Sequence, residues 1–395
     1  MEQICFDEVI NRRNTNCAKW DTMDAKYGGT DLIHLGVADL DFRTPKPITD
    51  AFQTCVDHGI FGYTDLNDGF YNGIIRWFKE KNRATVKRDE IVFCPRISIS
   101  VSLAVETFTN EGDELLIHTP SYDALYDAVV KNKRKAVTSP LVFDGERYRI
   151  NFDELEKSVS DKTKMYILCS PFNPVCRVWD QDELDKIGEF CEKHNLLLFV
   201  DEIHGDMVAP NVTFTTALLL KESVRQRLIV ASSLTKTFNI PGIIVSYLVI
   251  PNESLRSKLK DDIDRIGMHN PNVFSVVAVE EGYQHCDDWY YAMLDYVNQN
   301  ETFTRQYFKE HFPEFEIMPR EGTYLLWVRY KNLGCTEQEL SDWFIKKAKV
   351  EVYMGTKFGN DGRGFFRINI GCPKILLKEA FDQMNQVYSQ LKSLH

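Results

Sequence analysis

The sequence predicts an α/β protein with a mainly parallel central sheet in a large domain, followed by a smaller α+β domain. Short apolar runs alternate with helical patterns between about residues 90 and 250. Continuous apolar strands separated by helices are typical of a parallel sheet that is covered on both faces. The pattern changes after about residue 285, and 395 residues exceed what one small core usually organises.

Six apolar runs are predicted as strands of the large sheet: 90–95, 114–120, 164–171, 196–202, 227–233 and 246–251. The stretches between them have the periodicity of amphipathic helices. One of these stretches begins at Asp180, and Glu183 follows three residues later. This spacing is the capping-box pattern of a helix start.

The C-terminal third predicts a different arrangement. Residues 287–313 predict one long helix that ends near Pro313, followed by a strand at 321–330, a helix at 336–350 and a strand at 365–371. We therefore expect three parts. They are an N-terminal segment (1–45) packing with the small domain, a large domain (46–285) and a small C-terminal domain (286–395).

Composition excludes several classes of function. The net charge of −11 argues against a nucleic-acid partner, because phosphate binding needs a basic face. No stretch approaches the ~18 apolar residues of a membrane span, and residues 1–14 lack the apolar core of a signal peptide. The ten cysteines contain no C-x-x-C pair, which favours reduced thiols over disulfides or zinc. We expect a cytoplasmic protein without metal or membrane partner.

Polar side chains follow four of the predicted strands at the point where each strand ends. In open α/β sheets, ligands bind outside the carboxyl ends of the strands, so we expect these side chains to meet. They are Tyr122 after the second strand, Asn173 after the third, Asp201 and His204 after the fourth, and Ser233 and Lys236 after the fifth.

Each of these residues alone has a purely structural interpretation. Asn173 suits a turn, Asp201 a helix N-cap, Tyr122 a packing ring and Lys236 a surface amine. Together they suit pyridoxal phosphate. A lysine forms a Schiff base with its aldehyde, and a carboxylate keeps its pyridinium nitrogen protonated. An aromatic ring covers one ring face, an amide holds the ring hydroxyl, and hydroxyls with helix N-terminal amides hold the phosphate.

With these motifs in place, the chain resembles fold type I pyridoxal-phosphate-dependent enzymes of the class I/II aminotransferase superfamily. Within them it is similar to the MalY/PatB group of cystathionine β-lyases and cysteine C–S lyases, which includes cystalysin. The resemblance runs nearly end to end. It is carried by "FDEVINRRNTNCAKWD" (6–21), "GVADLDFRTPKPI" (36–48), "FGYTD" (61–65), "TPSYDALY" (119–126), "SPFNPVCRVW" (170–179), "DEIHGDMV" (201–208), "SLTKTFNIPG" (233–242), "EGTYLLWV" (321–328) and "GRGFFRINIGCP" (362–373).

The resemblance implies a cofactor site. Lys236 would hold pyridoxal 5'-phosphate and later act as the base, and Asp201 would pair with the pyridine nitrogen. Asn173 would contact the ring hydroxyl, and Tyr122 would stack on the ring. Ser233 and the amides near Ile97 and Ser98 would bind the phosphate.

The resemblance also implies how substrate and a second subunit take part. Arg367 would grip the substrate α-carboxylate in a bidentate pair, with Asn173 beside it. Tyr63 would reach the phosphate and substrate site of the neighbouring subunit, which makes a homodimer the minimum unit. Ala38, with Val37 and the loop 353–358, would shape the specificity pocket. His204 either faces the cofactor or has a packing role.

The implied activity is a C–S β-lyase that cleaves L-cystathionine, L-cysteine or cysteine S-conjugates to pyruvate, ammonia and a thiol. Two alternatives remain open. An aminotransferase on the same fold would require an α-keto acid and release no sulfide. A regulatory protein that acts by binding a partner would retain only incidental activity.

Three positions depart from the usual family pattern. Arg96 and Cys176 stand where many relatives have glycine, and Met354 stands where many have proline. Because glycine often serves positive φ, we expect an altered or strained backbone at Arg96 and Cys176. Arg96 either points to solvent or adds a cation near the phosphate. Cys176 is either a reactive thiol or a small buried one.

Overall fold

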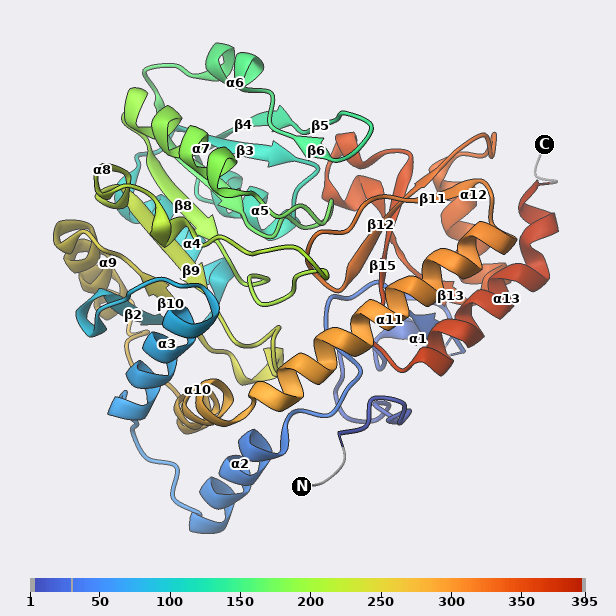
Figure 1. The fold of residues 1–395 in the computed structure, drawn as a ribbon, viewed down its shortest axis with the longest axis horizontal. Coiled ribbons are helices and arrows are strands. Elements are labelled where there is room, and N and C mark those ends of the chain that lie inside the picture. The colour runs from blue at the N-terminus through green and yellow to red at the C-terminus, as the bar shows by residue number, and fades with distance from the viewer. Residues whose placement is uncertain (1–3, 30, 393–395) are drawn as a thin grey trace.

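The computed structural model describes residues 4–29 and 31–392. A large sheet and a smaller one lie next to each other, and a long helix leads from the part with the large sheet to the part with the smaller one (Figure 1). All strands of the large sheet are parallel except β10, which is antiparallel to both neighbours. This agrees with the predicted mainly parallel sheet. In spatial order, the strands are β2 (Ile91–Cys94), β10 (Ser246–Val249), β9 (Leu228–Ser232), β8 (Leu197–Asp201), β7 (Thr163–Cys169), β3 (Glu114–Thr119) and β4 (Lys135–Pro140).

The six predicted strands are all present, and the seventh, β4, was missed. β4 lies at one edge of the sheet, and most of its side chains are exposed or half-buried. It therefore lacks the continuous apolar run that marks a strand covered on both faces. The central strands β7, β8 and β9 are almost wholly buried and form the middle of the core.

Helices cover the large sheet. α7 begins with the predicted capping box, since Asp180 accepts a hydrogen bond from the Glu183 amide and Glu183 accepts one from the Asp180 amide. α3 packs against α10, and α4 packs on the sheet. The helices of this part are α2 (Lys46–His58), α3 (Asp68–Lys81), α4 (Ile97–Phe108), α5 (Asp123–Lys131), α6 (Phe152–Ser158), α7 (Gln181–Lys193), α8 (Glu222–Arg225), α9 (Glu253–Arg265) and α10 (Val273–His285), with a hairpin β5 (Val142–Phe143) and β6 (Tyr148–Arg149).

The long helix α11 (Asp287–His311) ends just before Pro313, as predicted. It leads from the large sheet's part of the chain to the smaller sheet's part and packs along α13 (Lys374–Lys392) (Figure 1). α12 (Glu337–Asp342) continues into a π-helical turn, Trp343–Ala348. The smaller sheet is antiparallel, in the order β11 (Phe315–Ile317), β12 (Leu325–Tyr330), β15 (Phe365–Asn369) and β14 (Tyr353–Met354).

The N-terminal segment contacts the C-terminal part of the chain. After the short helix α1 (Met23–Tyr27), strand β1 (Ile33–His34) pairs in parallel with β13 (Val350–Glu351). Phe6 packs against the rings of Phe42, Trp289 and Tyr296. The segment that follows β1 is thereby brought over the carboxyl ends of the large sheet's strands.

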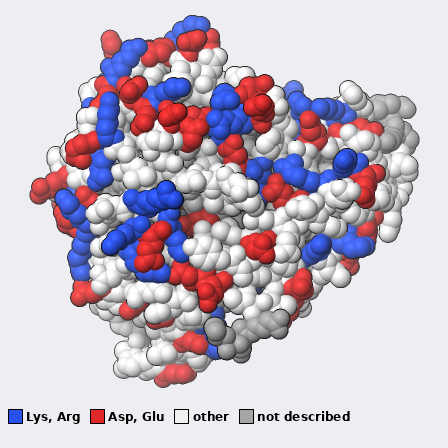
Figure 2. All heavy atoms as spheres, viewed as in Figure 1, with Lys and Arg blue, Asp and Glu red and all other residues white. Residues whose placement is uncertain are grey.

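Acidic and basic side chains are interspersed on the face that Figure 2 shows. Among the described residues, every helix is too short or too polar to cross a membrane. All ten cysteines are free thiols.

Candidate active site

A cavity of about 330 Å³ lies at the carboxyl ends of β7, β8 and β9, between the large sheet and β15. Segments from the N-terminal part, the large sheet and the smaller sheet all contribute to its walls. Ten of the predicted site residues line it: Ala38, Ile97, Ser98, Tyr122, Asn173, Asp201, His204, Ser233, Lys236 and Arg367. Tyr63 does not, because it lies in the loop between α2 and α3 with its side chain fully exposed.

Lys236 lies in the turn that follows β9, and its side chain points into the cavity. Its Nζ donates a hydrogen bond to the Ala38 carbonyl. Burial and the neighbouring Arg367 guanidinium lower the pKa of Lys236 to about 8, against the opposing effect of Asp39 and Asp201. An amine with this pKa has a substantial neutral fraction near neutral pH, as a nucleophile or base requires.

Asp201 is the last residue of β8 and is 2% exposed. Its Oδ1 accepts a hydrogen bond of 3.0 Å from the Ile203 amide. Burial raises the pKa of Asp201 to about 6, while the Ile203 amide and Lys236 act in the opposite direction. The carboxylate is therefore mainly ionised at pH 7, and it can accept a bond from a protonated ring nitrogen.

Asn173 and Arg367 are joined directly. Arg367 Nη1 donates to Asn173 Oδ1 at 2.8 Å, and Nη2 donates to the Gly36 carbonyl at 2.7 Å. The guanidinium lies over the rings of Tyr353 and Phe358, 5.2 and 4.7 Å from their centroids. Its buried Nε has no hydrogen-bond partner among the described residues. A buried cation with an unused donor facing a cavity suits a carboxylate ligand.

His204 lies three residues after Asp201 and is 3% exposed. Burial, with the nearby Lys236 and Arg367 charges, lowers the pKa of His204 well below its usual value, so the ring is neutral. Its Nδ1 has no hydrogen-bond partner among the described residues. Its ring meets that of Tyr324 edge to face, with 5.9 Å between centroids. The structure thus brings this ring to the cavity wall.

The predicted phosphate end lies where α4 begins, at Ile97 and Ser98. The Ser233 hydroxyl donates to the Val245 carbonyl at 2.6 Å and lies 2.8 Å from Thr235 Oγ1. A hydroxyl carries one proton, so Ser233 would have to release Val245 in order to donate to a phosphate. Thr235, which was not among the predicted site residues, also lines the cavity.

The three departures from the family pattern have different consequences. Arg96 has φ −145°, which is extended backbone open to any residue, so the strain expected there is absent. Its exposed side chain lies at the cavity wall. Met354 has φ −63°, the value that a proline would impose, so the replacement leaves the backbone path unchanged.

Cys176 has φ +62°, as expected for a residue at a glycine position. Its Sγ points into the protein and contacts the Pro174 and Leu325 carbonyls, each at 3.2 Å. Burial raises the pKa of the Cys176 thiol to about 11. The thiol is therefore neutral and packed, and it is not among the residues that line the cavity.

Tyr122 immediately precedes α5 and lines the cavity with its side chain partly exposed. Two further residues on the wall came from the loop that we expected to shape the pocket, Tyr353 and Lys357. Sequence reasoning missed Tyr324, whose hydroxyl donates to the Ala38 carbonyl at 3.0 Å. It belongs to the "EGTYLLWV" segment, but a single tyrosine beside an apolar strand carries no signal of its contacts.

Comparison with known proteins agrees with this architecture. A family model for aminotransferase class I and II matches residues 30–384. Cystathionine beta-lyase PatB of Bacillus subtilis is 32% identical over 97% of this chain and all of its own length. Protein MalY of Escherichia coli is 31% identical over 95% of this chain and 96% of its own. Cystalysin from Treponema denticola, whose structure contains pyridoxal 5'-phosphate, superimposes with a TM-score of 0.95 at 30% identity, covering 98% and 100% of the two chains.

The mainly parallel sheet, the second smaller sheet and the cavity between them define the class: an aminotransferase-fold enzyme. The chain belongs to the aminotransferase class I and II family, and within it to the group that includes PatB and MalY.

Proposed function

We propose that this protein is a pyridoxal-phosphate-dependent C–S β-lyase. Its substrates would be L-cystathionine, L-cysteine or cysteine S-conjugates, cleaved with uptake of one water to pyruvate, ammonia and a thiol, which is hydrogen sulfide in the case of L-cysteine. The observation that carries the proposal is the convergence of Lys236, Asp201, Asn173 and Arg367 on one cavity. The full-length similarity to a cystathionine beta-lyase selects this activity within the family.

The residues present fit the cofactor. Lys236 offers an amine of lowered pKa for the aldehyde, and Asp201 offers a buried carboxylate for the ring nitrogen. His204 keeps an unpartnered buried Nδ1 at the wall. The first amides of α4 supply a helix N-terminus for the phosphate. When bound, pyridoxal phosphate supplies an electrophilic aldehyde and an electron sink for the pair released at the substrate Cα.

The chain's own groups would then orient the substrate and move its protons. Arg367 binds the α-carboxylate through its fork of donors, and its bond to Asn173 fixes the plane of that fork. Lys236 Nζ takes the proton from Cα, so the thiolate on Cβ can leave. The negative charge of Asp201 would keep the ring nitrogen of the bound cofactor protonated. A protonated ring favours the removal of the proton from the substrate Cα. Tyr122, which lines the cavity, would stack on the cofactor ring.

A direct assay tests the proposal. The purified protein, with pyridoxal phosphate, is incubated with L-cystathionine and with L-cysteine. Pyruvate is measured in both, together with the thiol released from L-cystathionine and the sulfide released from L-cysteine. We expect both products in equal amounts, and none from a Lys236→Ala variant. Lys357→Ala, which removes another lysine from the same wall, serves as the matched control and should retain cofactor binding. If neither substrate releases a product, the lyase assignment is wrong.

The family match makes an aminotransferase the second candidate. The same residues would hold the cofactor for transamination, and Lys236 would then serve to move the Cα proton without the loss of a thiolate. An α-keto acid requirement, with no thiol released, would identify this reaction.

We also propose that the protein works as a cytoplasmic homodimer in which Tyr63 reaches the partner's site. Supporting this, the loop between α2 and α3 carries exposed Ile60, Phe61 and Tyr63, at 72%, 59% and 102%. In Figure 1, α2 and this loop project from the body of the chain. Exposed apolar side chains grouped in this way favour an interface. Ten free cysteines suit a reducing compartment.

A further inference from the structure

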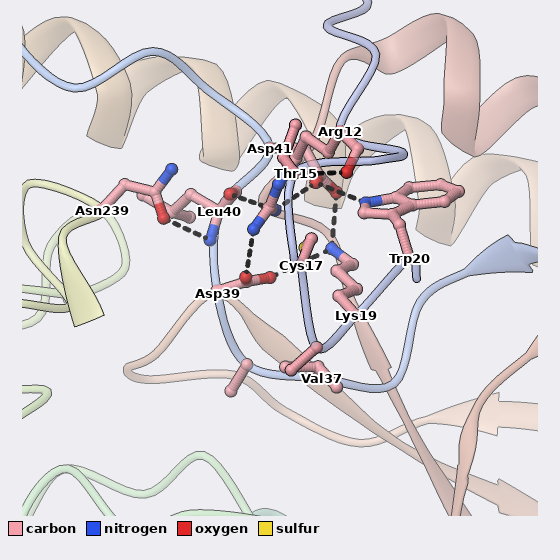
Figure 3. Close-up of polar contacts among 12 residues, drawn as sticks. Arg12, Thr15, Cys17, Lys19, Trp20, Val37, Asp39, Leu40, Asp41 and Asn239 are labelled. Carbon is pink, nitrogen blue, oxygen red and sulfur yellow. Dashed lines mark hydrogen bonds and ion pairs between the residues drawn. The ribbon is translucent and has the colours of Figure 1, made fainter. Parts of the chain in front are cut away.

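A buried ion cluster lies beside the candidate active site and consists of Arg12, Lys19, Asp39 and Asp41 (Figure 3). Arg12 contacts Asp39 at 2.7 Å and Asp41 at 2.6 Å, and Lys19 contacts the same two carboxylates. The Lys19 side chain is only 1% exposed. Two cations thus balance two carboxylates, and burying such a set is favourable only when every charge is paired.

The ion cluster contacts the segment Val37–Asp41 on the side that faces away from the cavity. Arg12 Nη1 donates to the Leu40 carbonyl at 3.1 Å, and Trp20 Nε1 donates to Asp41 at 3.2 Å (Figure 3). Residues 12–20 are thereby tied to the stretch of chain that reaches the cavity at Val37 and Ala38. No other role for these four charges follows from the proposed reaction.

Residues in and around the candidate active site contact the same segment from the side of the cavity. Lys236 Nζ and the Tyr324 hydroxyl both donate to the Ala38 carbonyl. Asn369 Nδ2 donates to the Asp39 carbonyl at 2.6 Å, and Asn239, three residues after Lys236, accepts from the Leu40 amide at 3.1 Å. Any shift of the segment would therefore move the acceptor of the Lys236 amine.

We propose that the cluster is a positioning device for Lys236. It fixes the Ala38 carbonyl that holds the Lys236 amine, and it places the Asp39 carboxylate where its charge acts on that amine. Arg12, Lys19, Asp39 and Asp41 are positioning residues in this role. The inference rests on the proposed function of Lys236, and its test is separate from the lyase assay.

The charges that face Lys236 come from several elements. Asp39 comes from the N-terminal segment, Asp201 and the neutral His204 from the end of β8, and Arg367 from β15. Arg367 lowers the pKa of Lys236, and the two carboxylates raise it. Tyr324 shares the Ala38 acceptor and stays protonated, because burial raises its pKa. Asp41 binds the same two cations, but it lies two residues further along the chain and contacts Trp20. Asp39 directly follows Ala38, and its charge, unlike that of Asp41, acts on Lys236.

This asymmetry provides a matched pair of variants. Asp39→Asn and Asp41→Asn each remove one carboxylate from the cluster while retaining its shape. In the cofactor-free full-length chain, methylation of Lys236 by formaldehyde and a borohydride reagent is followed against pH by peptide mass spectrometry. We expect Asp39→Asn to lower the pH midpoint by about one unit, since an opposite charge nearby has been removed. Asp41→Asn should leave it within about 0.3 unit.

A third variant distinguishes charge from damage. Arg12→Gln leaves the cluster more negative, so it should raise the midpoint, opposite to Asp39→Asn. Circular dichroism establishes that each variant is folded, and the pH dependence of the bound cofactor's absorbance gives a second readout. Equal shifts in the two asparagine variants, or a shift of Arg12→Gln in the same direction as Asp39→Asn, would overturn the inference. Absence of lyase activity with these midpoints as expected would count against the proposed function alone.

Discussion

At the scale of single residues, the candidate site depends on opposite charges buried in one cavity. Burial favours the neutral forms of Lys236 and Asp201. The pKa of Lys236 is lowered to about 8, and the pKa of Asp201 is raised to about 6. Each charge offsets part of the other's shift. The interval between these two values is where the amine is partly neutral while the carboxylate remains ionised, and we expect activity to be greatest there.

Replacing the carboxylate-binding arginine tests the substrate geometry. We expect Arg367→Gln to lower kcat/KM by about 10- to 100-fold, because a charge-assisted hydrogen bond contributes about 1.5–3 kcal/mol. The loss should fall mainly on KM for the amino acid, with the cofactor absorbance retained. Arg96→Gln changes an exposed arginine on the same wall and serves as the control. A large loss in Arg96→Gln with none in Arg367→Gln would show that Arg96, not Arg367, holds the carboxylate.

We expect Glu202, which follows Asp201, to make the stability of the protein depend on pH. It accepts hydrogen bonds from the Thr216 hydroxyl and the Ala217 amide, both at 2.8 Å, and burial raises its pKa to about 8. The unfolded chain ionises this group near about 4.3. The folded chain therefore binds more protons between these values, so this group's contribution to stability falls as pH rises towards 8.

A Glu202→Gln variant removes this ionisation and preserves the shape of the side chain. The difference in Tm between the variant and the wild type should increase in the variant's favour by at least about 2 °C between pH 5 and pH 8.5. Glu222→Gln, in the short surface helix α8, is the control. A Tm difference that is constant with pH would contradict the assignment of Glu202.

At the scale of elements, the turn between β7 and α7 couples backbone conformation to the site. Asn173 and Cys176 lie in this turn, and Glu321 and Gly322 donate their amides to the Cys176 carbonyl at 2.9 and 3.0 Å. The turn is thus tied to the segment that leads into β12. Its left-handed residue, Cys176, holds Asn173 at the position where it meets Arg367.

Two substitutions at Cys176 test this conformation. We expect Cys176→Val to destabilise the protein by about 1–3 kcal/mol, because a β-branched side chain is strained at positive φ. Cys176→Gly relieves the strain but loses the sulfur contacts, so its net change should stay within about 1 kcal/mol. Urea unfolding measures both. Equal urea midpoints for the two variants would mean that the positive φ at position 176 does not affect the stability of the protein.

At the scale of the whole molecule, we propose that residues 286–395 form the smaller domain and that residues 1–45 bind it to the larger one. The parallel pairing of β1 with β13 and the packing of Phe6 on Trp289 support this division. The cavity receives side chains from all three parts, so its shape depends on their relative position.

The assembly prediction also belongs to this scale. Light scattering should give about twice the chain mass of 45.8 kDa. Mixing inactive Tyr63→Ala and Lys236→Ala subunits should restore about a quarter of wild-type activity. Random pairing makes half of the dimers mixed, and each mixed dimer has one complete site. If subunits exchange and no activity returns, Tyr63 does not act across the interface.

The sequence predicted the strands that are covered on both faces, because continuous apolar runs mark them. It missed β4, whose exposed edge position leaves no such run. It also predicted six residues that meet at one cavity, since parallel strands end at one rim, and the resemblance added Ala38, Ile97, Ser98 and Arg367. It could not show that the glycine position of Arg96 has extended backbone, because φ follows from the path of the neighbouring chain.

The sequence by itself determined the fold class, the family and the chemical set of Lys236, Asp201, Asn173 and Arg367, because strand periodicity and local motifs are encoded within a few residues. Only the tertiary structure decided that Arg12 and Lys19 pair with Asp39 and Asp41 beside the site. Only the tertiary structure decided that Ala38 holds the Lys236 amine. These contacts join residues up to 198 positions apart, and the close packing that creates them has no local pattern.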